Sequence, residues 1–309
     1  MRPLVLALNP SVDVEWRVPQ VRWEEKNDVL SERRWPGGKG VNVARWLKHL
    51  GANPQLLMPL GGSTGKEVST GLRREKISLH VIPLHDPTRA NVIVTAATGG
   101  QLRFNPLGPL VSAAQWKEIL RQTKRELARA SVLVLSGSLP RGLAVDAYAT
   151  LIRIARDGDV RTLLDCDGPR LAAGIKERPF LVKPNQHELE QWSGRTLKTP
   201  ADIQGAASEL SRMTRGWVLV SLGEAGALLV NDSEGFCHQG SVGRVKSLNT
   251  VGAGDALLAA VANQIQRGAL PEQWLKWGVA TGTAATTCPA GVLPTLGVIR
   301  KLAASLAMS

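Results

Sequence analysis

A single aspartate, Asp255, follows a glycine pair and precedes a helix-forming run in the segment NTVGAGDALLAA, residues 249–260. Aspartate is among the best residues for capping a helix N-terminus, and Ala256–Ala260 is good helix material. The same position suits catalysis, because glycine N–H groups can hold a phosphoryl group while a carboxylate accepts a proton from the attacking hydroxyl. The segment alone supports a cap and a general base equally.

A second glycine cluster, Gly37-Gly38-Lys39-Gly40, stands directly before an amphipathic helical pattern that continues to Leu50. Unobstructed backbone N–H groups at the positive end of a helix dipole suit an anion. A flexible turn that leads into a helix is the alternative. The cluster alone leaves both interpretations open.

The segment after the apolar run Phe180–Val182 combines Lys183 with Asn185 and Glu188, which are three residues apart. This spacing puts the amide and the carboxylate on one side of a helical first turn, from which both can reach a hydrated Mg²⁺ ion. The same residues fit a capping box, in which Asn185 caps the helix and Glu188 completes the pair. Without other motifs, the spacing favours the capping box.

A third group of small residues, Ser221, Gly223 and Gly226, follows the apolar run Trp217–Val220. Two glycines after a strand are typical of a hairpin turn. They would equally allow a nucleotide to lie close to the backbone, so this segment is a candidate nucleotide site.

Composition limits the class of protein. The 309 residues are 43% hydrophobic and 21% charged, and no apolar run approaches the roughly 20 residues that span a bilayer. Three widely spaced cysteines and a short apolar N-terminus indicate neither a disulfide framework, a zinc site nor an export signal, so we expect a cytoplasmic protein. The net charge of +12 indicates anionic partners: nucleic acid, a membrane surface or small phosphorylated metabolites.

The order of apolar runs predicts an α/β fold. Short continuous runs, which are typical of buried parallel strands, alternate with longer helical patterns. The predicted strands are 4–8, 132–135, 162–165, 180–182 and 217–221, and the predicted helices are 41–50, 113–130, 145–156, 201–213, 256–266 and 273–285. We therefore expect a mostly parallel central sheet with helices on both faces, and ligands beyond the carboxyl ends of its strands.

Two early segments interrupt this alternation. Residues 13–34 alternate roughly between apolar and polar, and residues 88–104 read as two strands around the turn Gly99-Gly100. We expect them to form a small β-sheet lid on a single domain that spans residues 1–309.

Together these segments make the chain resemble the PfkB family of carbohydrate kinases, which have the ribokinase-like fold. The matching segments occur in the family's order along the whole chain: Gly37–Asn42, Ser136–Pro140, Val182–Asn185 with Glu188, Ser221–Gly223 with Gly226, and Thr250–Asp255. Leu8–Asp13 and Thr88–Asn91 look like the branch of phosphofructokinases and tagatose-6-phosphate kinases. That resemblance implies a substrate that already carries one phosphate.

The resemblance also implies a role for each matching residue. Asp255 would be the catalytic base, and Gly252, Ala253 and Gly254 would form the anion hole for the transferred phosphoryl group. The sugar phosphate would be held by Asp13, Gly38, Lys39, Asn42 and Arg89, with Lys26, Arg103 and Ser138 as weaker candidates. ATP would contact Lys183, Ser221, Gly223 and Gly226, and Asn185 and Glu188 would position Mg²⁺ through water.

The implied reaction transfers the γ-phosphoryl group of ATP to a ketohexose phosphate. Lys39, Thr88–Asn91 and Leu181–Gly194 look most like 1-phosphofructokinases, so fructose 1-phosphate is the preferred acceptor, with fructose 6-phosphate and tagatose 6-phosphate as alternatives. Because exposed lid strands need covering, we expect a homodimer through the lid. We expect neither a nucleic-acid nor a membrane partner. The alternative of another class is a non-catalytic nucleic-acid-binding or regulatory protein that has kept a kinase fold.

Overall fold

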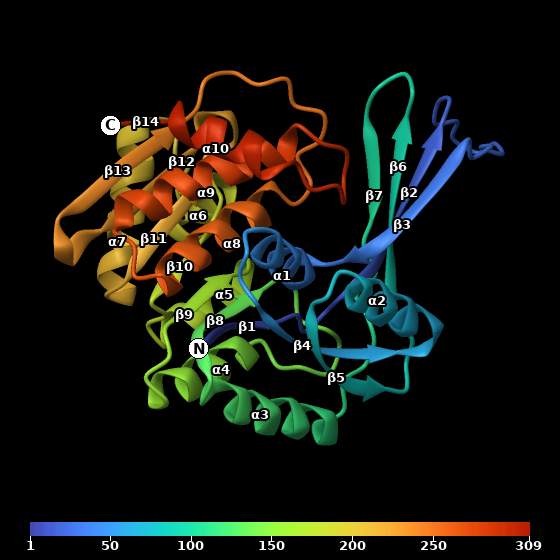
Figure 1. Ribbon diagram of the computed structural model, residues 1–309, viewed down its shortest axis with the longest axis horizontal. Coiled ribbons are helices and arrows are strands. Elements are labelled where there is room, and N and C mark those ends of the chain that lie inside the picture. The colour runs from blue at the N-terminus through green and yellow to red at the C-terminus, as the bar shows by residue number, and fades with distance from the viewer.

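The computed structural model describes all 309 residues, Met1–Ser309, and contains one sheet of ten strands and one of four (Figure 1). The strands of the large sheet are β1 (Arg2–Leu6), β4 (Gln55–Gly61), β5 (Ser78–Leu84), β8 (Ala130–Ser136), β9 (Thr162–Asp165), β10 (Leu181–Val182), β11 (Trp217–Ser221), β12 (Ala227–Asn231), β13 (Phe236–Ser241) and β14 (Ala307–Met308). Their spatial order is β14-β13-β12-β11-β10-β9-β8-β1-β4-β5. All neighbours from β11 to β5 pair in parallel, and β12, β13 and β14 extend the sheet antiparallel.

The central strands are buried on both sides, which explains their unbroken apolar sequences. Val5 of β1 lies in register with Leu56 of β4 and with Val134 of β8, and none of the three is exposed. Strands that are covered on both faces need no alternation of polar residues. The two buried clusters of apolar side chains lie on opposite faces of this sheet.

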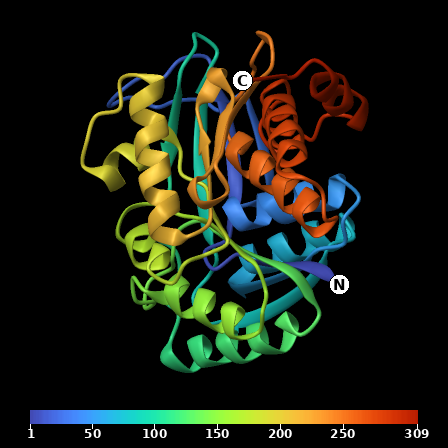
Figure 2. The same cartoon turned by 90° about the vertical axis from the view of Figure 1, so that its left-hand side faces the viewer.

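Helices cover both faces of the large sheet, as Figure 2 shows for α7 on one side and α8, α9 and α10 on the other. One face carries α1 (Lys39–His49), α2 (Gly62–Arg74), α8 (Ala253–Gln266), α9 (Pro271–Thr286) and α10 (Leu296–Ala304). The other carries α3 (Ala113–Leu127), α4 (Ala147–Asp157), α5 (Gly168–Ile175), α6 (Gln186–Ser193) and α7 (Pro200–Thr214). Two 3₁₀ turns, η1 (Gly223–Ala225) and η2 (Asp232–Glu234), complete the elements. The predicted α/β fold with helices on both faces is confirmed.

The helices differ in how they begin. Helix α3 starts with a capping box between Ser112 and Gln115, as several surface helices do. Helices α1 and α8 instead start at Gly38 and Gly252, with φ of 93° and 80° and no side-chain cap. A backbone position with positive φ favours glycine. Because no side chain caps these two helices, no capping side chain blocks the N–H groups of the first turn from a ligand.

The small sheet has the strand order β3-β2-β6-β7 and stands apart from the large one at the upper right of Figure 1. Its strands are β2 (Ser11–Val18), β3 (Ser31–Gly37), β6 (Arg89–Ala96) and β7 (Gln101–Phe104). Gly99 and Gly100 turn the chain between β6 and β7 with φ of 100° and 88°. The two segments that interrupt the α/β alternation therefore do form β-structure.

Strands β4, β5, β12, β13 and β14 and helices α2, α5 and α10 are not among the predicted elements, and of α6 only the first turn at Asn185 and Glu188 is predicted. Helix α2 contains Gly62, Gly65 and Gly71, which lower its intrinsic helix propensity, and tertiary packing of Val68 and Leu72 stabilises it instead. None of the helices combines the length and the apolar character that a membrane crossing requires.

Candidate active site

A cleft of about 710 Å³ opens at the carboxyl ends of the parallel strands. Strand β1 lies between β4 and β8 in the sheet. Strands that follow β1 in the chain therefore lie on both sides of it, so the order of strands reverses at β1. Ligands of open α/β sheets bind at such switch points. The cleft is lined by residues at or just beyond the ends of successive strands: Asn9, Ser136, Asp165, Lys183 and Ser221.

Asp255 lines this cleft and is buried, with only 5% of its surface exposed. It is the third residue of α8, and Gly252 is the N-cap, so the interpretation of Asp255 as the capping residue is wrong. Its Oδ2 accepts a hydrogen bond of 2.8 Å from the amide of Asn42 on α1. The carboxylate is therefore oriented by a side chain and points into the cleft.

The pKa of Asp255 is raised to about 7. Burial is the main cause, and the negative charge of Asp165 adds to it, while Lys39, Asn42 and Lys183 act in the opposite direction. A carboxyl group that titrates near neutral pH can both accept and release a proton there, as a general base must.

Asp165, at the end of β9, holds two lysines. Its Oδ1 is 3.2 Å from Nζ of Lys39 and 3.3 Å from Nζ of Lys183, and Ser136 donates a hydrogen bond of 3.2 Å to Oδ2. Although burial opposes it, the charges of Lys183 and Lys39 lower the pKa of Asp165. Sequence reasoning missed this residue; the available signal was its position as the polar end of the predicted strand 162–165.

Lys39 contacts acidic residues at the centre of the cleft. Besides Asp165, its Nζ lies 4.0 Å from Oε1 of Glu188, and Asp165 is the main cause of its raised pKa. No ion pair joins Lys39 to Asp13. The structure thus groups Lys39 with Lys183 and Glu188, which the resemblance assigned to the ATP side, rather than with the small sheet.

The small sheet contributes Asp13 to the cleft. The Oδ1 of Asp13 accepts hydrogen bonds of 2.7 Å from Ser11 and 2.9 Å from Asn91, and burial raises the pKa of Asp13. Gly37 approaches so closely that a Cβ atom there would lie 2.1 Å from the Asp13 carboxyl carbon. Asn91 belongs to the segment Thr88–Asn91 that the sequence singles out, although no separate role was assigned to it.

Arg89 lies beside Asn9 and is held by backbone carbonyls. Its guanidinium donates hydrogen bonds of 2.9 Å to the carbonyls of Pro106 and Asn9, and the Asn9 amide donates one of 3.0 Å to Ser138 Oγ. Arg89, Arg103 and Ser138 all line the cleft. Lys26 does not: its side chain is 87% exposed and pairs with Asp28.

Asn185 and Glu188 form the capping box of α6 that their spacing favours. Asn185 Oδ1 accepts from the Glu188 N–H and Glu188 Oε2 accepts from the Asn185 N–H, both at 2.8 Å. Glu188 Oε1 remains on the Lys39 side, and both residues line the cleft. No group of three or more acidic, histidine or cysteine side chains lies close enough together to hold a metal ion.

The segments predicted to bind the nucleotide separate into two groups. Ser221, Gly252 and Gly254 line the cleft, and a Cβ at Gly254 would lie 3.5 Å from Lys183 Nζ. Ala253, Gly223 and Gly226 are not among the lining residues. Gly226 is required by packing, because a Cβ there would lie 2.0 Å from the Gly240 carbonyl oxygen and its φ is 86°.

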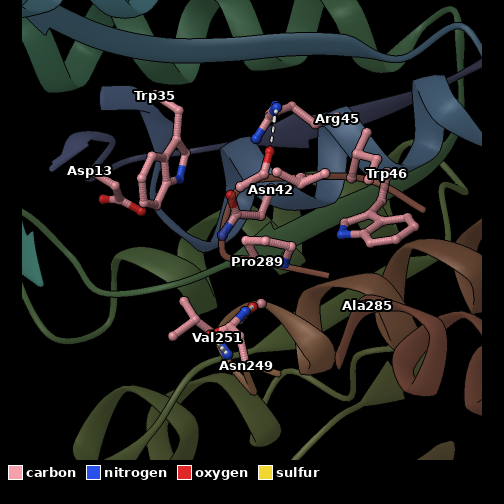
Figure 3. A pocket seen from close by; sticks show the side chains of 13 residues that line it. Asp13, Trp35, Asn42, Arg45, Trp46, Asn249, Val251, Ala285 and Pro289 are labelled. Atoms are coloured by element: carbon pink, nitrogen blue, oxygen red, sulfur yellow. Dashed lines mark hydrogen bonds between the residues drawn. The ribbon is translucent and has the colours of Figure 1, made fainter. Parts of the chain in front are cut away.

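A smaller cavity of about 30 Å³ adjoins the cleft (Figure 3). Asp13, Asn42, Val251 and Gly252 line both spaces. Arg45 and Gly291 also line the smaller cavity, and Arg45 donates a hydrogen bond of 3.2 Å to the Gly291 carbonyl. This space has room for a few water molecules at most, so a sugar or nucleotide must occupy the larger cleft.

Comparison with known proteins gives the class of protein to which this fold and site belong. Residues 12–296 match the model of the pfkB family carbohydrate kinases. The chain therefore belongs to this family, and the resemblance on which the sequence interpretation rests is confirmed.

Individual relatives are similar along nearly their whole length. The ATP-dependent 6-phosphofructokinase isozyme 2 of Escherichia coli (strain K12) is 36% identical over 289 residues, 93% of this chain and 93% of that protein. The 1-phosphofructokinase of Bacillus subtilis (strain 168) is 32% identical over 280 residues, 90% of each. The solved structure of phosphofructokinase-2 from Escherichia coli in its tetrameric inhibited form has a TM-score of 0.91 at 34% identity and covers 98% of each chain.

Proposed function

We propose that this carbohydrate kinase transfers the γ-phosphoryl group of ATP to a hydroxyl of a ketohexose monophosphate. The observation that carries the proposal is the position of Asp255: a buried carboxylate with a pKa of about 7 lies in the uncapped first turn of α8, where a phosphoryl group and its acceptor would meet. Kinases need little covalent chemistry from the protein, because positioning and charge stabilisation supply most of the rate.

The residues divide the reaction between them. Asp255 accepts the proton of the sugar hydroxyl as its oxygen attacks the γ-phosphorus, and the bond from phosphorus to the bridging oxygen of ADP breaks. The N–H groups at the start of α8, except that of Ala253, which donates to the Thr250 carbonyl, face the transferred group together with Lys183. Asp13 holds sugar hydroxyls, and Arg89 with Ser138 holds the phosphate that the sugar already carries, beside the small sheet acting as a lid.

The donor set suits a magnesium ion that arrives with ATP. Mg²⁺ keeps several waters and is bound through one or two carboxylates and the substrate phosphates. Glu188 offers one carboxylate oxygen that the capping box leaves free, and Asn185 lies beside it. When bound, the ion would neutralise phosphate charge.

Fructose 1-phosphate is the acceptor we propose first, because the residues around Lys39 and Thr88–Asn91 resemble 1-phosphofructokinases. Fructose 6-phosphate is the second candidate, since the 6-phosphofructokinase isozyme 2 has the higher identity of the two relatives above. Phosphorylation of either acceptor gives the same product, fructose 1,6-bisphosphate.

A coupled assay of ADP release tests the function. Fructose 1-phosphate, fructose 6-phosphate and tagatose 6-phosphate are compared, with fructose and ribose as unphosphorylated controls. We expect kcat/KM to be highest for one of the phosphorylated ketoses. Turnover of none of the three would refute the proposal, and salt-sensitive nucleic-acid binding without ADP release would then favour the binding-protein alternative.

We further propose a homodimer through the small sheet. Trp23, Leu30 and Phe104 on or beside its strands are 75%, 66% and 54% exposed, and four-stranded sheets with open edges need covering. Sedimentation velocity of the wild type and of Trp23→Asp tests this, with the equally apolar and exposed Leu270, outside the sheet, changed to Asp as the control. A monomeric wild type, or a Trp23→Asp variant that still forms the same dimer, would contradict it.

A further inference from the structure

The most buried charge in the cleft belongs to a residue with no assigned role. Asp165 is 1% exposed, and its Oδ1 lies within 3.3 Å of two ammonium groups, those of Lys39 and Lys183. Its Oδ2 is occupied by the hydroxyl of Ser136, and its own carbonyl accepts the N–H of Gly137 at 2.9 Å. With both carboxylate oxygens occupied in this way, Asp165 is fixed in place.

The two lysines reach Asp165 from different parts of the fold. Lys39 begins α1, and Lys183 follows β10 on the far side of β9. Lys183 is only 4% exposed, so an unpaired ammonium there would be costly. Two ammonium groups that share one carboxylate oxygen would repel each other without it. The pairing therefore decides where both positive charges lie.

Both positive charges line the cleft together with the proposed catalytic base. The charges of Asp165 from β9, Lys39 from α1 and Lys183 from the segment after β10 all act on the pKa of Asp255. Lys183 also lies near Gly254 at the start of α8. A phosphoryl group held at that helix start and attacked by a hydroxyl bound to Asp255 would have both ammonium groups beside it.

We propose that Asp165 is a positioning residue, which holds the ammonium groups of Lys39 and Lys183 together at the place where the transferred phosphoryl group is stabilised. The inference rests on the proposed function and deepens it. It reassigns Lys39 from the phosphate that the sugar already carries to the group in transfer. Asp165 itself touches neither substrate.

The test compares Asp165→Asn with Asp232→Asn. Asp232 lies on η2 outside the cleft, and its carboxylate pairs with Arg212 instead of a lysine. We expect Asp165→Asn to lose about 10²-fold or more in kcat, because misplaced charge contacts to a transition state cost that much. Asp232→Asn should stay within about twofold of the wild type. Near-wild-type kcat in Asp165→Asn would overturn the proposal.

A pH profile separates positioning from a merely structural role. Because the charge of Asp165 helps to raise the pKa of Asp255, the acid limb of kcat/KM should move to lower pH in Asp165→Asn. A loss of folding alone would reduce the active fraction without moving this limb. An unmoved limb would therefore count against the inference.

A double-mutant cycle tests whether Asp165 acts through Lys39. The change Asp165→Asn should cost less in kcat when Lys39 is already methionine, because one of its two partners is gone. Equal costs in both backgrounds would contradict the pairing. If Asp165→Asn unfolds, the double variant Asp165→Asn/Lys39→Met, which lacks the charges of both Asp165 and Lys39, is compared with Lys39→Met.

ATP binding, measured by titration calorimetry, keeps the two proposals distinguishable. If the wild type turns over a ketohexose phosphate but Asp165→Asn does so equally well, only the inference fails. If no sugar phosphate is turned over, the proposed function fails. In that case a tenfold weaker affinity of Asp165→Asn for ATP, relative to the wild type, still supports the pairing of the lysines, and an unchanged affinity rejects it.

Discussion

The side-chain amide of Asn42 donates a hydrogen bond of 2.8 Å to Asp255, joining residues that are 213 positions apart in the chain. The two residues lie in the first turns of α1 and α8, helices that both begin at an uncapped glycine. Neither first turn uses a side chain to cap itself. This hydrogen bond instead links the two glycine-rich helix starts and orients the Asp255 carboxylate between them.

Replacing the proposed base tests its role directly. Asp255→Asn keeps the size of the side chain but cannot accept the hydroxyl proton, so kcat should fall by about 10²- to 10⁴-fold. Affinity for ATP, measured by calorimetry, should stay within a few fold. Asp232→Asn, on η2 and paired with Arg212, is the control and should keep full activity. A rate near that of the wild type in Asp255→Asn would leave the carboxylate as a purely structural group.

The pH dependence follows from the raised pKa of Asp255, which is about 7. Only the ionised carboxylate accepts a proton, so kcat/KM should be full above this pKa and fall as the pH drops through it. The Asn42 hydrogen bond lowers the pKa, so Asn42→Ala should move the acid limb to higher pH. Profiles of both proteins from pH 5 to 9 check this. A shift to lower pH in Asn42→Ala would contradict the assignment of the limb to Asp255.

The sequence predicted the elements that carry a strong local pattern. Continuous apolar runs or clear helical periodicity predict the strands β1, β8, β9, β10 and β11 and the helices α1, α3, α4, α7, α8 and α9, each within a few residues. Strand β5 alternates and includes Pro83, and α2 contains three glycines, so their stability comes from packing that no local pattern reveals.

The site was predictable where a motif spans it and not where contacts are long-range. Glycines that start α1 and α8 and the pair Asn185 and Glu188 are local patterns. The position of Lys39 depends on Asp165, which is 126 residues away and has no motif of its own. Such a contact follows from the order of strands in the sheet, which the sequence pattern does not specify.

Arg89 offers a test of how the sugar phosphate is held. Its guanidinium lies in the cleft beside Asn9 and is oriented by two carbonyls. If Arg89 holds the sugar phosphate as proposed, Arg89→Ala removes charged hydrogen bonds to that phosphate. Since such bonds contribute about 1.5–3 kcal/mol, KM for the sugar phosphate should rise about 10- to 100-fold. KM for ATP should change little. Arg153→Ala, which loses only a surface pair with Glu177, is the matched control. A larger rise in KM for ATP than in KM for the sugar phosphate would contradict this assignment and indicate that Arg89 contacts ATP.

Gly226 and Gly223 form a matched pair that separates packing from nucleotide binding. Both have positive φ, 86° and 60°, but a Cβ at Gly226 would lie 2.0 Å from the Gly240 carbonyl oxygen, whereas Gly223 faces open space. Gly226→Ala should therefore lower the free energy of unfolding by about 3 kcal/mol, through backbone strain and a clash with β13. Gly223→Ala should cost only about 1 kcal/mol, from the left-handed conformation alone. Urea unfolding of both variants measures the difference, and KM for ATP at low temperature reports on the site. Equal stabilities, together with a raised KM for ATP in Gly226→Ala, would show that Gly226 serves the nucleotide rather than the sheet.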